Sequence, residues 1–295
     1  MIPDTGNRFM MMPPLRDETS SRRKPVMTRQ ENVRTCVVHA HNRIVLLGAS
    51  NLTLSLRLVI QLMQRRVGSP SEILTAVGHG RAYGVSSQVM WRGLPGIAAC
   101  GLWQQLDSMQ PRPTVAMLTD IGNDILYGLP PEQILHSVEW CIGQLQHHAA
   151  QIVVTNLPIA SIEGLSERRY TFFRTMFYSS SQMSRAQTVD CARAVHQGLT
   201  EMASRRHFKL YEQKPIWFGL DGIHIDYLQR QAFYQDIVQH FPQACTPSDS
   251  GINQGIITLS WQRRPVFAYK TFLNRPIHCQ QPSGQLTDGS IVCKY

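Results

Sequence analysis

The chain has 295 residues, of which 43% are hydrophobic, and this is enough for one large α/β domain with a core of its own. Charged residues make up 17%, below the roughly 25% of an average soluble domain, which excludes a highly charged disordered chain. The net charge of +9 comes from short, scattered basic clusters that indicate a solvated surface, so no nucleic-acid partner is expected.

The seven cysteines are an odd number without a CxxC pair or a metal-site spacing, which favours free thiols in a reducing compartment. Cys279 and Cys293 would pair only in an exported protein. The first apolar stretch is interrupted at Pro13, Pro14 and Arg16 before it reaches signal-peptide length, and no run approaches the ~18 apolar residues of a membrane span. The expected location is therefore the cytoplasm.

In chain order, residues 1–40 come first and are polar, basic and without periodicity, so we expect a disordered arm. Order is predicted to begin at the aliphatic run 43–47, which stops at Gly48. Apolar residues then recur at helical spacing from Leu54 to Met63. This pattern predicts a strand, a tight turn and a helix.

The same alternation continues to residue 242. Apolar runs of strand length occur at 72–77, 114–119, 151–155 and 208–211, and helical patterns occur at 131–148, 187–205 and 227–241. Buried strands that alternate with helices are typical of α/β proteins. The sequence thus predicts a doubly wound, mostly parallel five-stranded sheet with helices on both faces, over residues 41–242.

Residues 243–295 follow a different pattern, with apolar runs at 256–261 and 266–269 between Pro- and Gly-bearing segments. A small β element packed on the domain and a partly ordered tail are both compatible with this C-terminal extension.

Ligands of open α/β sheets gather at the carboxyl ends of the strands, and polar residues follow four of the predicted strands. Ser50 comes directly after the first strand, where the amides and dipole of a helix N-terminus favour a developing negative charge. A serine at this position is also a common helix N-cap. Ser50 is therefore a candidate nucleophile only in combination with other residues.

His224 follows the fifth strand, and Asp221 precedes it by three residues. A turn between the two would place the carboxylate against one ring nitrogen, which fixes the tautomer and stabilises the imidazolium. The alternative is an Asp-Gly turn that leads into a helix.

Gly80 and Asn123 follow the second and third strands. A glycine amide can approach a substrate without steric hindrance, and an asparagine side chain can donate to a substrate oxygen. Conformational glycine and turn-forming asparagine are the alternatives.

These blocks, in this order, resemble the SGNH (GDSL-like) hydrolase family. The family blocks read Gly-Asp-Ser, Gly, Gly-x-Asn-Asp and Asp-x-x-His, and they match Gly48-Ala49-Ser50, Gly80, Gly122-Asn123-Asp124 and Asp221-Gly222-Ile223-His224 over residues 43–241. Two departures are that Ala49 replaces the usual aspartate and that no residue separates Gly122 from Asn123. The resemblance implies the flavodoxin-like SGNH fold.

The resemblance further implies a serine esterase that needs no metal or organic cofactor. Ser50 would be the nucleophile, His224 the base and Asp221 its orienting partner, while Ser50, Gly80 and Asn123 would form the oxyanion hole. Among Gly78, Gly80 and Gly84, the Gly80-Arg81 step most resembles the family loop. Candidate substrate contacts are Asn51, Arg81 and Tyr83.

The expected substrate is a small-molecule, carbohydrate or lipid ester. An acyltransferase that uses the same residues is an alternative function, and so is a catalytically inactive SGNH-fold binding protein. The oligomeric state is left open.

Overall fold

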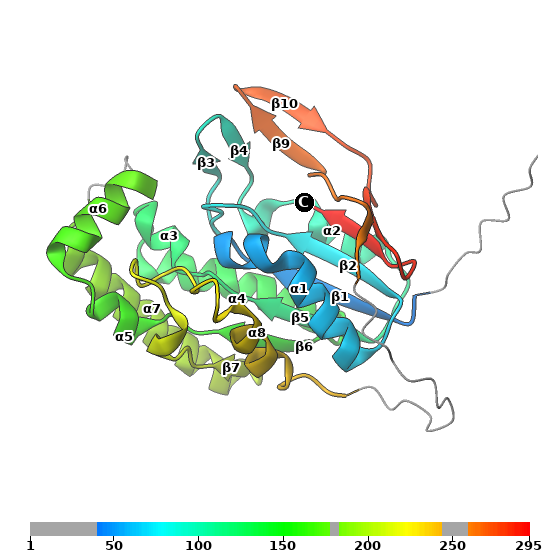
Figure 1. Ribbon diagram of the computed structural model, residues 1–295, viewed down its shortest axis with the longest axis horizontal. Coiled ribbons are helices and arrows are strands. Elements are labelled where there is room, and N and C mark those ends of the chain that lie inside the picture. The colour runs from blue at the N-terminus through cyan, green and yellow to red at the C-terminus, as the bar shows by residue number, and fades with distance from the viewer. Residues whose placement is uncertain (1–39, 178–182, 244–258) are drawn as a thin grey trace, which may run out of the picture. The chain divides into compact units, whose positions relative to one another are not determined.

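A computed structural model describes residues 40–177, 183–243 and 259–295 (Figure 1). The predicted arm, up to residue 39, lies outside the described residues. All five predicted strands form, and they pair in parallel in the order β7-β6-β5-β1-β2, which confirms the doubly wound α/β architecture. Their bounds are β1 (Asn42–Leu47), β2 (Ser71–Ala76), β5 (Thr114–Leu118), β6 (Gln151–Thr155) and β7 (Lys209–Tyr211).

The central sheet has eight strands among the described residues, because three strands of the C-terminal extension are added to the five predicted ones. Strand β12 (Ile291–Lys294) pairs in parallel with β2, and β11 (Gly284–Leu286) and β8 (Trp261–Arg263) follow in antiparallel pairing. The C-terminal extension therefore continues the main sheet. Without β12, β2 would be an edge strand with a row of unpaired backbone groups. Residues 256–258 of a predicted apolar run lie outside the described residues.

A second sheet of four antiparallel strands joins two hairpins that are far apart in the sequence (Figure 1). Strands β3 (Ser87–Val89) and β4 (Arg92–Leu94) form one hairpin, and β9 (Tyr269–Phe272) and β10 (Arg275–His278) form the other. The two hairpins meet through β4 and β9. The sequence pattern at 87–94 predicts no strand, so this sheet is a new feature.

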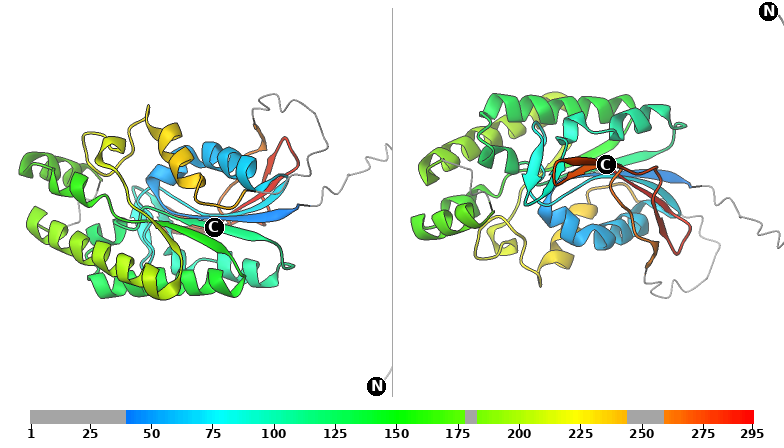
Figure 2. Two further views of the ribbon diagram at one scale, coloured as in Figure 1. Left: turned by 90° about the horizontal axis from the view of Figure 1, so that it is seen from below. Right: turned by 90° about the horizontal axis from the view of Figure 1, so that it is seen from above.

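Helices cover both faces of the central sheet (Figure 2). Helices α1 (Ser50–Val67) and α8 (Arg230–Val238) pack on one face, and α2 (Leu102–Ser108), α4 (Pro131–His147) and α7 (Arg185–Arg206) pack on the other. Side chains alternate along each strand, so Ile44 faces α1 whereas Val45 faces the α4 side. The predicted helix 227–241 is shorter than expected because residues 227–229 form a turn. The remaining helices among the described residues are η1 (Ile97–Ala99), α3 (Asn123–Leu126), α5 (Ile159–Glu163), α6 (Glu167–Phe177) and η2 (Pro215–Trp217).

None of the helices in the described ranges has the length and apolar character that crossing a membrane requires.

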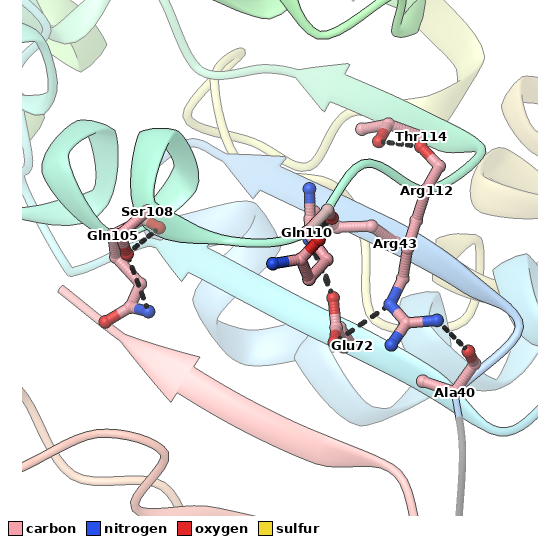
Figure 3. Close-up of polar contacts among 8 residues, drawn as sticks. All are labelled: Ala40, Arg43, Glu72, Gln105, Ser108, Gln110, Arg112 and Thr114. Carbon is pink, nitrogen blue, oxygen red and sulfur yellow. Dashed lines mark hydrogen bonds and ion pairs between the residues drawn. The ribbon is translucent and has the colours of Figure 1, made fainter.

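A buried ion pair holds β1 and β2 together near their amino ends (Figure 3). Arg43 has only 1% of its surface exposed, and its Nη2 lies 2.9 Å from Oε2 of Glu72. Arg112 approaches the other carboxylate oxygen at 3.0 Å, and Arg43 also donates to the carbonyl oxygen of Gln110. Glu72 thus neutralises two guanidinium groups at the amino ends of the strands. The candidate site lies at the opposite, carboxyl ends.

Glu72→Gln is expected to lower the free energy of unfolding by about 3 kcal/mol, because it leaves the buried Arg43 charge without a counter-charge. Urea denaturation of the two proteins measures the difference. Glu139→Gln is the matched control, since Glu139 also accepts from two arginines, Arg205 and Arg206, but both are largely exposed. The control should lose less than about 1 kcal/mol, and equal losses would contradict the role of burial.

Candidate active site

Ser50 is the first residue of α1, directly after the turn that leaves β1. This turn passes so close to β5 that a Cβ on Gly48 would lie 2.6 Å from Cγ2 of Thr119, which explains the glycine. The Ser50 side chain does not cap the helix. Its Oγ lies 2.9 Å from Nε2 of His224, so the helix-cap alternative does not describe this serine.

His224 and Asp221 lie in the loop between η2 and α8. Asp221 Oδ2 is 2.6 Å from His224 Nδ1, while its Oδ1 accepts from the amides of Ile223 and His224. Gly222 has a φ of +70°, a conformation that favours glycine. The Asp-Gly turn itself places the Asp221 carboxylate against the His224 ring. The turn and the histidine-orienting role, given as alternatives from the sequence, are therefore both present.

The pair perturbs the titration of both groups. Burial lowers the pKa of His224, but the hydrogen bond and charge of Asp221, with the charge of Asp120, outweigh it, so the pKa is raised. Burial raises the pKa of Asp221, but the hydrogen bonds from the side chain and backbone of His224 outweigh it, so the pKa is lowered. The arrangement thus favours an ionised Asp221 and stabilises a protonated His224.

Asp120 is a site residue to which the sequence analysis assigns no role. It follows β5 with a φ of +60°, which is unusual for a residue other than glycine. Its Oδ2 accepts from the amide of Ala49 at 2.8 Å, and its Oδ1 accepts from Asn51 Nδ2 at 2.9 Å. Asp120, at the end of the neighbouring strand β5, therefore stabilises the serine turn through these hydrogen bonds. Two sequence features could have indicated this role. Asp120 stands at the end of a predicted strand, and Ala49 stands where the resembled family has an aspartate before the serine.

Asn51 connects the serine turn to the histidine loop. Its Nδ2 donates to Asp120 and to the carbonyl of Ile223 at 3.0 Å, and its Oδ1 accepts from the amide of Ile225 at 2.9 Å. These bonds show that Asn51 positions the site. Asn51 also lines the cavity beside Ser50, and its contact with substrate stays a prediction.

The expected substrate contacts Arg81 and Tyr83, in contrast, do not line the cavity. Both side chains are fully buried. Arg81 donates to the backbone oxygens of Val77, Pro95 and Tyr295, and the Tyr83 hydroxyl donates to the carbonyl of Thr119 at 2.9 Å. Their polar atoms thus satisfy backbone carbonyls behind the loop that follows β2.

Asn123 and Gly80 differ in their placement. Asn123 lines the cavity next to Ser50, and its Nδ2 donates to the carbonyl of Arg81 at 3.0 Å. Gly80 is not among the cavity residues, has a φ of +65°, and accepts from the hydroxyl of Tyr127 at 2.7 Å. The amide of Gly84 donates to Asp124 and is already engaged. The structure brings Asn123 to the site, and the oxyanion role of Gly80 stays a prediction.

A largely apolar cavity opens beside Ser50 and His224. It extends from the loops after β5 and β6 toward α5, α6 and α7. Ile121, Leu157, Ile162, Leu165 and Ala192 are among the residues that line it. An apolar chemical group of a substrate could occupy this space next to the serine.

No family model matches the chain, and no curated protein matches its sequence. Similar solved structures include a carbohydrate acetylesterase family member from Sinorhizobium meliloti, with 15% identity over 67% of this chain and 95% of the other, at a TM-score of 0.48. The aryl esterase of M. smegmatis is 15% identical over 67% of this chain and 97% of the other, at a TM-score of 0.47.

A third similar structure is a member of the lipolytic G-D-S-L family from Veillonella parvula, with 10% identity over 68% of this chain and 100% of the other, at a TM-score of 0.42. This is the family that the four sequence blocks resemble. Since each of these TM-scores is below 0.5, the function proposed next rests on the geometry around Ser50.

Proposed function

We propose that the protein is a serine hydrolase that cleaves carboxylic esters through an acyl-enzyme intermediate. The observation that carries the proposal is the continuous contact from Ser50 Oγ to His224 Nε2 at 2.9 Å and from His224 Nδ1 to Asp221 Oδ2 at 2.6 Å, at the mouth of a cavity. A helix cap or a simple turn requires no such chain of contacts, whereas nucleophilic catalysis does.

In the first half of the reaction, Ser50 Oγ attacks the ester carbonyl carbon while His224 Nε2 accepts the hydroxyl proton. The ionised Asp221 stabilises the imidazolium that forms. The carbonyl oxygen becomes negative, and the proposed donors to it are the Ser50 amide, the Asn123 side chain and the Gly80 amide. The Ser50 amide belongs to the first turn of α1, whose N–H groups have no partner within the helix.

The tetrahedral intermediate then collapses. The bond to the alcohol oxygen breaks, and His224 gives its proton to the departing alcohol, which leaves Ser50 acylated. Water attacks the acyl carbon as His224 accepts its proton, and the second collapse releases the carboxylic acid and restores the Ser50 hydroxyl.

The cavity supports an apolar acyl group as part of the substrate. The alcohol must leave from the side of His224, which protonates it, so the acyl group lies on the other side of the carbonyl. Ile121 and Leu157, which follow β5 and β6, line the cavity together with His224, and we assign the acyl group to this apolar part of the cavity. Burial of an apolar acyl chain there would contribute roughly 0.8 kcal/mol per CH₂ group.

Incubation with diethyl p-nitrophenyl phosphate tests the proposal. Ser50 Oγ is expected to attack phosphorus and release p-nitrophenolate, because a base and amide donors surround it. Mass spectrometry of the digested protein should locate the diethyl phosphoryl adduct on the peptide that contains Ser50. A folded protein that takes no label, or takes it at another residue, would contradict the assignment.

A further inference from the structure

A group of basic side chains gathers at the carboxyl ends of β2 and β12. His79 lies three residues past the end of β2, and Lys294 is the last residue of β12. Strands β1, β2 and β12 are neighbours in the sheet, with Leu47 beside Ala76 and Thr75 beside Lys294. His79 and Lys294 therefore lie at the carboxyl ends of the strands, on the same side of the sheet as the serine turn after β1.

Arg92 of β4 completes the group. Its Nη2 donates to the carbonyl oxygen of His79 at 3.3 Å. The guanidinium carbon of Arg92 lies 5.4 Å from the centre of the Phe267 ring, and Nζ of Lys294 lies 4.1 Å from the same centre. The Phe267 ring thus makes cation–π contacts with both Arg92 and Lys294, so two like charges lie close together.

In residues 40–177, 183–243 and 259–295, no ion pair joins an acidic side chain to this group. Residues 77–106 and 259–287, which contain the loop after β2 and the whole second sheet, include no aspartate or glutamate. Within the described residues, Nε of Arg92 and Nη2 of Arg81, which lies behind the group, are buried without a hydrogen-bond partner. The charge of Asp120 acts on His79, but the Asp120 carboxylate is already bonded to the serine turn.

The cations destabilise one another. Burial, followed by the charges of Arg92, Arg81 and Lys270, lowers the pKa of Lys294 to about 8. Burial, followed by the charges of Arg92, His224 and Lys294, lowers the pKa of His79. The effect of His224 shows that the group is within electrostatic reach of the candidate base. Unfavourable charge arrangements of this kind are expected at functional sites.

We propose that His79, Arg92 and Lys294 bind an anionic oxygen group, a carboxylate or a phosphate, on the alcohol part of the ester substrate. The assignment to the alcohol rests on the proposed esterase function. The apolar cavity follows β5 and β6, whereas the basic group follows β2 and β12, and Ser50 after β1 lies between them in the strand order. The two halves of an ester that extend in opposite directions from Ser50 would meet an apolar and a cationic environment.

Binding of inorganic phosphate tests the anion site without reference to catalysis. At equal ionic strength, 10 mM phosphate is expected to raise the Tm of the full chain by about 3 °C relative to chloride. Arg92→Gln and Lys294→Gln should each remove this shift. Lys209→Gln is the matched control because Lys209 is an exposed residue of β7, at the other edge of the sheet, and it should keep the shift.

The Tm of each variant without phosphate shows that it is folded. Lys294→Gln should have a Tm equal to or above that of the natural chain, since it removes a charge from a repulsive group. Absence of a phosphate-specific shift in the natural chain, or an equal shift in all variants, would overturn the proposal.

A pair of esters tests whether the anion belongs to the substrate. The natural chain should hydrolyse 4-acetoxybenzoate with a kcat/KM about tenfold above that of its neutral methyl ester. Lys294→Gln should abolish this preference, whereas the control Lys209→Gln should keep the preference and the kcat/KM values of both esters. A phosphate shift without any preference would overturn the assignment to the substrate. Hydrolysis of neither ester, with the phosphate shift intact, would reject the esterase function and support the anion site.

Discussion

Replacing Ser50 by alanine is expected to lower kcat for ester hydrolysis by about 10⁶-fold, since it removes the atom that attacks the carbonyl while the rest of the site stays in place. The measurement is single-turnover and steady-state hydrolysis of p-nitrophenyl esters, with circular dichroism to show that the variant is folded. KM should change little, because the cavity walls and the amide donors are retained.

Ser55→Ala is the matched control for this change. Ser55 lies on the same helix, is 4% exposed and does not line the cavity, so its replacement should leave kcat near that of the natural chain. Full activity of Ser50→Ala would mean that another group is the nucleophile.

Asp221→Asn is expected to lower kcat/KM by about 10⁴-fold with the fold retained. Asparagine keeps an oxygen acceptor for the amides of Ile223 and His224 but loses the negative charge next to Nδ1. It also removes the partner that raises the pKa of His224. The imidazolium that forms during attack would lack its stabilising carboxylate.

The pH profile distinguishes this role from a structural one. Catalysis requires neutral His224, so kcat/KM of the natural chain should fall as the pH drops through the raised pKa of His224, above 6.5. In Asp221→Asn the pKa is lower, so the acid limb of the residual activity should move to lower pH. Asp226→Asn, whose Oδ1 accepts from the amide of Leu228, is the control and should change neither rate nor profile. An unshifted acid limb in Asp221→Asn would argue against the proposed pair.

The five parallel strands could be predicted because each is a short buried run between helical patterns. The way in which the C-terminal extension joins this sheet could not, because it depends on β12, whose partner β2 is distant in sequence. Strand β12 is defined by its pairing with β2, and nothing within residues 291–294 specifies that partner.

The candidate site was predictable to the extent that chain order places residues at strand ends. Ser50 and the Asp221–His224 pair lie together although β5 and β6 separate β1 from β7, because the loop between η2 and α8 returns to the serine turn and is held there by Asn51. Side-chain direction was not predictable, and for this reason Arg81 and Tyr83 were assigned to substrate although they point into the core. Asp120 was given no role because its partner is the backbone amide of Ala49 in another turn. A contact with a backbone amide produces no recognisable motif spacing in the sequence.

The pairing of β12 with β2 also constrains how the protein can be made. The amide of Ser71 at the start of β2 bonds to the side chain of Ser290, which is 219 residues further along the chain. During synthesis on the ribosome, β2 emerges long before its neighbour and presents an open edge that invites pairing with other nascent chains. Arg81, in the loop after β2, donates to the backbone oxygen of Tyr295, directly after β12. This loop therefore reaches its final structure only after β12 has been made.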